Sequence, residues 1–454
     1  MLTPLPTQLS GAAFLASRKT ALLADQPRVG KTGAAIMAAD YIFARSILVV
    51  TTASGRSVWK RAFPQWSNFG RSLQVLLPKD HLRPDADVLI VSWGSISDPS
   101  LRSRLLLRKF DLIISDEDHW ACHFTAARTQ AFYGEMIEDG ARILIKTALA
   151  SRAKTLWALT GTPMPNALID AYVRLRVLVP EKLFADPAKG WPDVVKYPDF
   201  RDRYCKWHPM KVGRGAWAKW VDVVTEGINE DELKARVGDW MLLRTQEDVG
   251  IRPPIYETLP LIVSEANRKA ADAGLNSSAI LAAAEAGRTA DLDMHLGPKR
   301  RLTGEIKARA VIEAVKEEFA GGLKKIVLAY WHKDVRTILE DGLAKFGVVA
   351  LDGSTTPANR LYAEEQFRDN PKIRVFLAQI VAAGEAIDLS AADEMLCVEM
   401  STIPKDMKQV ALRITNNQKA GNTRVRVASL AGSVDEPLQE ILLRKWSSIR
   451  KVLS

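Results

Sequence analysis

The sequence has few cysteines: three among 454 residues, at positions 122, 205 and 397. They lie far apart, and none belongs to a Cys-x-x-Cys pair, the spacing typical of zinc ribbons and redox-active thiols. The pattern argues against a structural zinc site and a disulfide framework. It fits a protein kept in a reducing cytoplasm.

Long hydrophobic runs are also absent. The apolar runs at residues 21–24 and 47–50 have the length of a strand, whereas a membrane-spanning helix needs about 20 apolar residues. Residues 1–9 contain no basic segment followed by an apolar core, so we expect no signal peptide. The sequence therefore predicts no attachment to a membrane.

The composition, 47% hydrophobic and 26% charged, is typical of a globular protein. Its length exceeds that of one ordinary core, so we expect two domains and an insertion. The net charge of +10 favours a polyanionic partner. A basic surface exposed to solvent would explain the same charge without any partner.

Short apolar runs alternate with helix-like stretches in two regions, residues 1–165 and 305–454, which predicts an α/β fold with two parallel sheets. The expected strands are residues 20–24, 47–51, 88–91, 112–115 and 156–159, then 325–330, 348–351, 375–378, 394–398 and 424–428. Residues 166–304 have few such runs and are expected to form a mostly helical insertion. Its tryptophans lie among lysines and arginines, where they could stack on nucleic acid, but packing in a helical core is about twice as favoured.

Residues 20–36 have the order of a phosphate-binding loop: an apolar run, a tight loop, then Gly30-Lys31-Thr32 opening a helix-forming segment. Backbone N–H groups and the helix N-terminus would hold phosphates, and Lys31 would reach the β and γ oxygens. The usual pattern has glycine where this chain has Asp25.

Two carboxylates, Asp116 and Glu117, follow the expected strand at 112–115. Asp116 could hold Mg²⁺ and Glu117 could orient or polarise the attacking water. An acidic turn is the simpler explanation of the pair in isolation. A phosphate-binding loop on the same sheet favours nucleotide hydrolysis instead, because the strand ends of a parallel sheet converge.

These segments resemble, in order, the motifs of a superfamily 2 helicase-like ATPase of the Snf (chromatin-remodeller) type, and within it the annealing-helicase branch and phage or bacterial relatives. This family carries an acid at the position of Asp25. The matching segments are 5–14 (Q motif), 23–32 (I), 48–54 with Trp59 (Ia), 91–93, 116–119 (II, DEAH-like with Asp118 in place of alanine), 159–166 (III), 326–334 (IV), 351–355 with Arg360, 378–393 (V) and 409–413 (VI).

The resemblance implies two RecA-like lobes with a helical insertion and an ATP hydrolase that uses Mg²⁺. Nucleotide contacts are expected from Gln8, which would read the adenine, and from Asp25, Arg28, Val29, Gly30, Lys31, Thr32, Gly384 and Asp388. Catalytic roles are expected for Lys31, Asp116, Glu117, Gln409 and Arg413. Thr32 and Asp116 would hold Mg²⁺, largely through water.

The resemblance also implies movement along double-stranded DNA by contacts with the phosphate backbone rather than the bases. The expected DNA contacts are Thr51, Thr52, Ser92, Trp93, Thr162, Asp352, Gly353 and Ala382. Such a protein would work in the cytoplasm at the nucleoid or in an infected bacterial cell, or in the nucleus of a eukaryote. The sequence identifies no protein partner.

Three positions depart from the family pattern: Arg28 replaces a loop glycine, Asp388 replaces an amide or hydroxyl residue, and Asn416 replaces the second arginine of motif VI. Such an arginine is typically worth ~10³–10⁵ in rate. Asn416 supplies no cation, so hydrolysis is expected to be slow, to use Arg413, or to need a partner's arginine.

Two alternatives stay open at this point. One is an RNA helicase of the same superfamily, which the Thr-Gly-Thr-Pro form of motif III and the long insertion disfavour. The other is a nucleic-acid-binding or protein-binding module that has lost turnover, which Asn416 favours and the intact Lys31, Thr32, Asp116 and Glu117 oppose.

Overall fold

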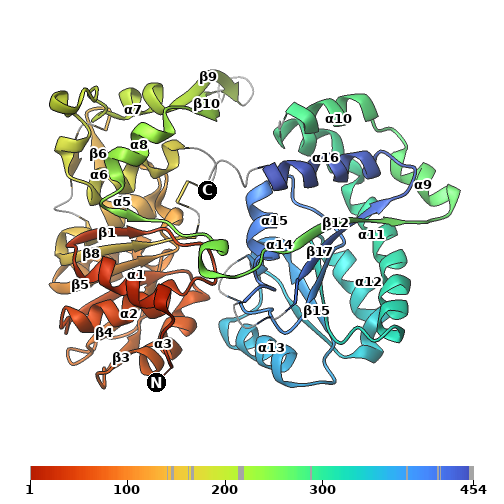
Figure 1. Cartoon of the computed structure of the whole chain (residues 1–454), viewed down its shortest axis with the longest axis horizontal. Coiled ribbons are helices and arrows are strands. Elements are labelled where there is room, and N and C mark those ends of the chain that lie inside the picture. The colour runs from red at the N-terminus through yellow and green to blue at the C-terminus, as the bar shows by residue number, and fades with distance from the viewer. Residues whose placement is uncertain are drawn as a thin grey trace. The chain divides into compact units, whose positions relative to one another are not determined.

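A computed structural model describes residues 2–140, 142–144, 148–161, 163–164, 168–212, 219–286, 289–384, 387–416, 419 and 421–448. The chain divides into two compact units, Met1–Thr245 and Gln246–Ser454 (Figure 1). Each unit is built around one parallel sheet, and each has its own hydrophobic core.

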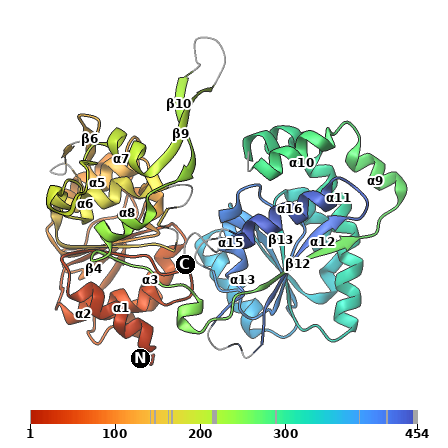
Figure 2. The ribbon, with the colours of Figure 1, turned by 45° about the horizontal axis from the view of Figure 1, so that its top comes forward.

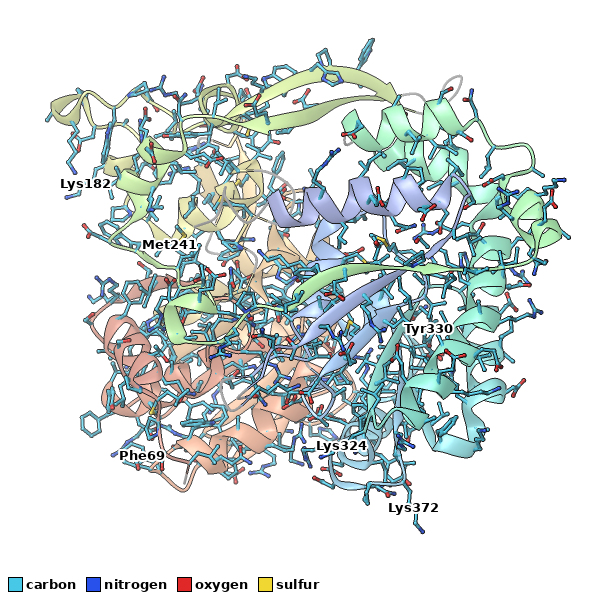
Figure 3. The ribbon with its side chains drawn as sticks, turned by 45° about the vertical axis from the view of Figure 1, so that its right-hand side comes forward. Phe69, Lys182, Met241, Lys324, Tyr330 and Lys372 are labelled. Atoms are coloured by element: carbon cyan, nitrogen blue, oxygen red, sulfur yellow. The ribbon has the colours of Figure 1, made fainter. Side chains whose placement is uncertain are left out.

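The first unit contains a seven-stranded sheet in the order β11-β1-β8-β5-β2-β4-β3, in which every pairing is parallel. Non-consecutive neighbours require crossover connections, and helices provide most of them. The strands are β1 (Thr20–Leu23), β2 (Ile47–Thr51), β3 (Leu73–Val75), β4 (Val88–Ser92), β5 (Phe110–Asp116), β8 (Ala153–Leu159) and β11 (Met241–Leu242), and Met241 is labelled in Figure 3.

Helices cover both faces of this sheet. One core contains apolar side chains of α1, α2 and α3, and the other contains those of α4, α5 and α6. Burial on both faces explains why β2 and β4 are continuous apolar runs rather than alternating ones. The helices are α1 (Pro6–Ala16), α2 (Lys31–Tyr41), α3 (Gly55–Trp66), α4 (Pro99–Leu106), α5 (Ala127–Tyr133), α6 (Tyr172–Leu178), α7 (Tyr197–Tyr204) and α8 (Glu230–Val237).

The second unit contains a six-stranded parallel sheet in the order β12-β17-β16-β13-β15-β14. Its strands are β12 (Ile255–Leu261), β13 (Ile326–Tyr330), β14 (Val348–Leu351), β15 (Val375–Gln379), β16 (Glu394–Cys397) and β17 (Arg424–Leu430). Its helices are α9 (Glu265–Asp272), α10 (Ser277–Ala286), α11 (Thr289–Ala320), α12 (Lys333–Leu343), α13 (Pro357–Asp369), α14 (Ile380–Ala383), α15 (Pro404–Ala411) and α16 (Asp435–Ser448).

All ten expected strands are present, with ends that differ by up to three residues, and the predicted class of two RecA-like α/β lobes is confirmed. The region 166–304 differs from the expectation of a mostly helical insertion. Its first part belongs to the first unit and its second part to the second unit.

This region also contains strands that the sequence pattern did not predict. An antiparallel hairpin, β9 (Cys205–Val212) with β10 (Lys219–Gly227), extends away from α7 and α8 (Figure 2). A second, short hairpin lies earlier in the first unit, between β6 (Glu135–Ile137) and β7 (Arg142–Leu144). Strands β11 and β12 each form one edge of a main sheet, and β12 contains Pro260, a residue that edge strands tolerate.

The tryptophans of this region have different environments. Trp191 and Trp240 pack against the core of the first unit, and Arg201 stacks on Trp207 with its guanidinium carbon 3.5 Å from the ring centroid. Trp220 is 69% exposed, and Trp217 lies outside the described residues. In the described part of the chain, no helix combines the length and apolar character needed to cross a membrane.

Candidate functional site

The carboxyl ends of five neighbouring strands of the first unit bring the predicted motifs to one edge. In the strand register, Leu23 lies opposite Leu159, and Leu159 lies opposite Asp116. On the next pair of strands, Thr51 lies opposite Ser92. The residues that follow these positions therefore share the edge at which open α/β sheets bind ligands.

The loop between β1 and α2 has the backbone of an anion-binding turn. Arg28 and Gly30 have φ angles of +74° and +101°, and Gly30 is the N-cap of α2. A positive φ is costly for a residue with a Cβ, which explains why glycine is usual at the position of Arg28. Val29 between them is buried. Positive φ angles beside a helix N-terminus turn backbone N–H groups toward an anion.

Gln8 on α1 lies directly against this loop. A Cβ at position 30 would come 2.6 Å from Gln8 Nε2, and one at position 33 would come 3.0 Å from the same atom. The Gln8 side chain is 6% exposed, and its Oε1 accepts a hydrogen bond from the Leu5 N–H at 2.9 Å. Gln8 therefore packs closely on both glycines, and Trp66 packs on Gly33 as well, with a Cβ there 2.9 Å from its ring.

Asp25 has a structural partner in the first unit. Its carboxylate is 1% exposed and receives two hydrogen bonds from Arg244, with Nε to Oδ1 at 3.0 Å and Nη2 to Oδ2 at 2.5 Å. Arg244 also donates to the Thr7 carbonyl and the Ser10 hydroxyl on α1. The acid that replaces the first loop glycine thus ties the loop to α1 and to the end of β11.

Lys31 and Thr32 open α2 and are both partly buried. The Lys31 ammonium donates to two carbonyl oxygens of its own loop, those of Asp25 at 2.6 Å and Gln26 at 3.3 Å. A phosphate oxygen bound to Lys31 would replace one or both of these acceptors. These two hydrogen bonds thus hold the Lys31 ammonium at the phosphate-binding loop.

Asp116 is partly buried at the end of β5, where protein groups surround its carboxylate. Oδ2 accepts hydrogen bonds from the Trp59 indole at 2.7 Å and the Thr51 hydroxyl at 2.8 Å. Burial and the neighbouring Glu117 carboxylate raise the pKa of Asp116 to about 6, although the two hydrogen bonds and the Lys31 cation oppose the shift. A carboxylate that is costly to ionise would gain from a nearby divalent cation.

Glu117 has a φ of +49°, which is uncommon for a residue other than glycine. Its Oε2 lies 3.3 Å from His119 Nδ1, and the same nitrogen lies 3.0 Å from the Thr160 hydroxyl. His119 therefore connects the second carboxylate of motif II to motif III. Gly161 then packs on the phosphate-binding loop, where a Cβ would come 2.9 Å from Pro27 Cδ.

Asp118 and Arg174 form an ion pair whose side chains are both 0% exposed, with Nε 2.8 Å from Oδ2. Asp118 Oδ1 accepts from the Ser115 and Tyr133 hydroxyls at 2.7 and 2.5 Å. Arg174 also donates to the carbonyl of Pro163 in motif III. The aspartate that replaces the usual alanine of motif II thus anchors α6 and motif III beneath the site.

The predicted DNA contacts of the first unit are largely enclosed. Thr51 is 0% and Trp93 1% exposed, and Trp93 donates its indole N–H to the Asp116 carbonyl at 2.8 Å. These two side chains thus contact Asp116, and their expected contact with DNA stays a prediction. Thr52 and Ser92 are 5% and 6% exposed and bond to Ser54 and Ser95. Thr162 lies outside the described residues.

Motifs V and VI come together in the second unit. Arg413 donates from Nη2 to the Gly384 carbonyl, and a Cβ on Gly384 would lie 3.3 Å from the Gln409 side-chain oxygen. Asn416 donates its amide to the Ser390 hydroxyl at 2.9 Å. Asp388 Oδ1 accepts from the Ser390 N–H at 2.9 Å. Asp388 and Asn416, two of the three unusual positions, therefore bond to the same serine.

The remaining predicted DNA contacts also lie in the second unit. Asp352 is 4% exposed and organises a turn, accepting from the Ser354 N–H and hydroxyl at 2.8 and 2.6 Å and from Arg336 at 2.8 Å. The hydrogen bond from the Ser354 side chain is the main cause that lowers the Asp352 pKa. Gly353 is exposed, and Ala382 is 9% exposed.

Arg174 and Arg244 are the site residues that the sequence reasoning missed. They lie in segments after motif III, at positions that no motif covers, and each pairs with an acid of motif I or II. One signal was available, because both acids come at the end of an apolar run. An acid that is buried there on folding needs a cation as its partner, and arginine is the usual partner.

The buried pair yields a prediction. Asp118→Asn and Arg174→Met each leave a partner charge in a fully buried site, so each is expected to destabilise the protein by about 3–5 kcal/mol. The double variant should lose less than the sum, with a coupling of about 1–3 kcal/mol in urea unfolding. The same cycle on the exposed pair Lys206 and Glu226 is the control and should show a coupling below about 1 kcal/mol. If the stability losses of the two single variants simply add in the double variant, Asp118 and Arg174 do not form the proposed ion pair.

Asp116 yields a second prediction. Its raised pKa means that the folded protein holds this proton more tightly than the unfolded chain, so ionised Asp116 costs stability above about pH 6. Asp116→Asn removes this cost and should stabilise the nucleotide-free protein by about 2–3 kcal/mol at pH 8. The gain should shrink between pH 6 and about pH 4.

Thermal and urea unfolding across this pH range measure the effect. Asp85→Asn is the matched control, since the Asp85 side chain is 74% exposed, and it should change stability little at any pH. If Asp116→Asn is less stable than the native protein at pH 8, the ionised Asp116 carboxylate does not lower the stability of the folded protein.

Comparisons with known proteins agree with this arrangement. Residues 307–417 match the family described as the helicase conserved C-terminal domain. The chain is 25% identical over 453 residues to the SWI/SNF-related matrix-associated actin-dependent regulator of chromatin subfamily A-like protein 1 of Xenopus tropicalis. It is 24% identical over 456 residues to the mouse DNA annealing helicase and endonuclease ZRANB3.

Each alignment covers 97% of this chain but only 44% and 40% of the respective relative, so the chain spans less than half the length of both. A solved structure of the Sulfolobus solfataricus SWI2/SNF2 ATPase core in complex with dsDNA covers 100% of this chain and 93% of that chain, at 17% identity and a TM-score of 0.44. Both relatives are animal proteins, so a bacterial or phage origin stays a prediction. In its motifs, its fold and its relatives, the chain resembles the superfamily 2 helicase-like ATPases of the Snf type.

Proposed function

We propose that this protein hydrolyses ATP in the presence of double-stranded DNA and uses the reaction to move along the DNA backbone. The observation that carries the proposal is the convergence of two motifs at one sheet edge. The turn at Gly30-Lys31-Thr32 and the carboxylates Asp116 and Glu117 follow strands in the same parallel sheet.

The residues of the phosphate-binding loop fit a nucleotide phosphate chain. The positive φ angles of Arg28 and Gly30, next to the N-terminus of α2, suit an anion. Lys31 would exchange its loop carbonyls for phosphate oxygens. Gln8, enclosed against the loop, is the proposed contact for the adenine, and Asp25 keeps the loop in place through Arg244.

Mg²⁺ fits the same edge, because it prefers oxygen ligands and two partly buried carboxylates, Asp116 and Glu117, lie at the end of β5. The proposed holders are Thr32 and Asp116, largely through water, and the ion would neutralise charge on the phosphates. Glu117 would accept a hydrogen bond from the attacking water and orient it. His119 holds Glu117 in position and connects it to Thr160.

Turnover depends on motif VI of the second unit, for which we propose Gln409 and Arg413 as the working residues. The Arg413 guanidinium bonds to the Gly384 carbonyl, so it must give up or share this contact to stabilise a phosphate. Asn416 is held by Ser390 and carries no charge. Hydrolysis is therefore expected to be slower than with two arginines.

Double-stranded DNA is the proposed track for two reasons. The net charge of +10 favours a polyanion, and both curated relatives are named for chromatin or for DNA annealing. Thr52, Thr162, Gly353 and Ala382 are the proposed backbone contacts. Such contacts position a protein without reading sequence.

The test compares ATP hydrolysis without nucleic acid and with duplex DNA, single-stranded DNA and RNA of the same length. Duplex DNA should give the largest stimulation. Lys31→Ala should lower the stimulated rate by about 10²-fold or more, because it removes a cation from the phosphates. Lys19→Ala, an exposed lysine just before β1, is the matched control and should keep the native rate.

The outcomes separate the alternatives. A larger stimulation by RNA would favour an RNA helicase, and ATP binding without turnover would favour a module that has lost the reaction. Asn416→Arg should raise the stimulated rate, since it restores a cation at the second motif VI position. If neither the native protein nor Asn416→Arg hydrolyses ATP with any nucleic acid, the proposed reaction is wrong.

A further inference from the structure

Three side chains with metal-binding atoms meet outside the proposed ATP site. One thiol sulfur, one imidazole nitrogen and one carboxylate oxygen, from Cys122, His123 and Asp170, all lie within 4.8 Å of one another. Cys122 is partly buried, His123 is exposed, and Asp170 is 4% exposed.

The three residues come from segments that the Asp118–Arg174 ion pair and the His119–Thr160 contact connect. Cys122 ends the short 3₁₀ turn Asp118–Ala121, which follows motif II, and His123 comes next. Asp170 lies in the 3₁₀ turn Leu168–Ala171, which leads into α6 after motif III. Arg174, one turn further on, holds Asp118 and the carbonyl of Pro163. The Asp118–Arg174 pair beside the cluster is therefore buried, while the cluster itself opens to solvent at His123.

We propose that Cys122, His123 and Asp170 bind a divalent transition-metal ion of the zinc class, with water as the fourth ligand. A thiolate, an imidazole and a carboxylate together select zinc over magnesium or calcium, which prefer oxygen ligands. Tetrahedral zinc holds its ligand atoms roughly 3.2–3.7 Å apart, given zinc–ligand bonds of about 2.0–2.3 Å. The ligand atoms therefore have to come closer together by about an ångström. Rotation of the exposed His123 side chain and of the Cys122 side chain provides this movement.

A metal at this position would join the segment after motif II to the segment after motif III. It would add a third connection to those made by the Asp118–Arg174 pair and the His119–Thr160 contact. Because folding brings Asp170 to Cys122 and His123, the metal should bind the folded protein more tightly than the unfolded chain and so stabilise the first unit. The site needs no nucleotide, so it can be tested whether or not ATP is hydrolysed.

The spacing of the three cysteines bears on only one kind of zinc site. It excludes closed sites built from paired cysteines, whereas this cluster combines one cysteine with a neighbouring histidine and a distant aspartate. Cys205 is close to Asp170 but takes a hydrogen bond from the Ile169 backbone, and burial raises the pKa of its thiol. Cys397 is buried in the second unit.

Cobalt(II) is the most direct probe, because it adopts the zinc geometry and gives a sulfur-to-cobalt charge-transfer absorption band when a thiolate binds it. Titration of the full chain with Co²⁺ under reducing conditions should give this band at one equivalent. Zn²⁺ added afterwards should remove it, and Zn²⁺ alone should raise the melting temperature.

Variants identify the ligands. Cys122→Ser should abolish the band, and His123→Ala, a change at an exposed position that should not disturb folding, should weaken Co²⁺ binding at least tenfold. Cys397→Ala is the matched control and should keep the native band and affinity. Absence of the band in the native protein, or its persistence in Cys122→Ser, would overturn the proposal. Loss of ATP hydrolysis with the band intact would count against the proposed function alone.

Discussion

Negative charge held at the carboxyl edge of the first sheet is the constraint on which the site depends. Asp25, Asp116, Glu117 and Asp118 all lie at the ends of strands β1 and β5. Carboxylates removed from water need cations or several hydrogen bonds. The chain supplies an arginine to Asp25 and another to Asp118, and a histidine to Glu117. Asp116 receives neutral donors from Trp59 and Thr51, with Lys31 as its nearby cation.

This distribution separates structural acids from a working one. An aspartate with a bidentate or fully buried arginine is a fixed part of the framework, because breaking such a pair is costly. An aspartate whose pKa is raised to about 6 is held in a less favourable state, which a metal ion can relieve. Under the proposed function, Asp116 would be held ready for a ligand at some cost in stability, as active sites commonly do.

The arginines also explain the extent of the first unit. Arg174 and Arg244 lie after motif III, in the region expected to form an insertion, yet their partners belong to motifs I and II. The strand β11 then adds one more strand to the sheet edge beside β1. Residues 168–245 are therefore part of the first unit through specific charge pairs and strand pairing.

The sequence predicted the central strands well, because β2, β4 and β13 are apolar on both faces and read as continuous runs. It also placed Gly30, Lys31, Asp116 and Glu117 at or after the ends of strands of one sheet, as the structure has them, while their roles stay predictions. Edge strands such as β11 and β12 and the β9–β10 hairpin escaped prediction, since short or exposed strands have no apolar run. The partners of Asp118 and Asp25 escaped too, because pairs 56 and 219 residues apart depend on the fold. The burial of Thr51 and Trp93 escaped prediction as well, because it accompanies their contacts with Asp116, which no motif indicates.

The central claim is that Asp116 is held for a metal ion bound with the nucleotide. Its most direct test is the ATP affinity of the native protein and of Asp116→Asn, measured by calorimetry with and without Mg²⁺. We expect Mg²⁺ to tighten ATP binding in the native protein and to have little effect in Asp116→Asn, with similar metal-free affinities. An equal effect of Mg²⁺ on both proteins would contradict the account.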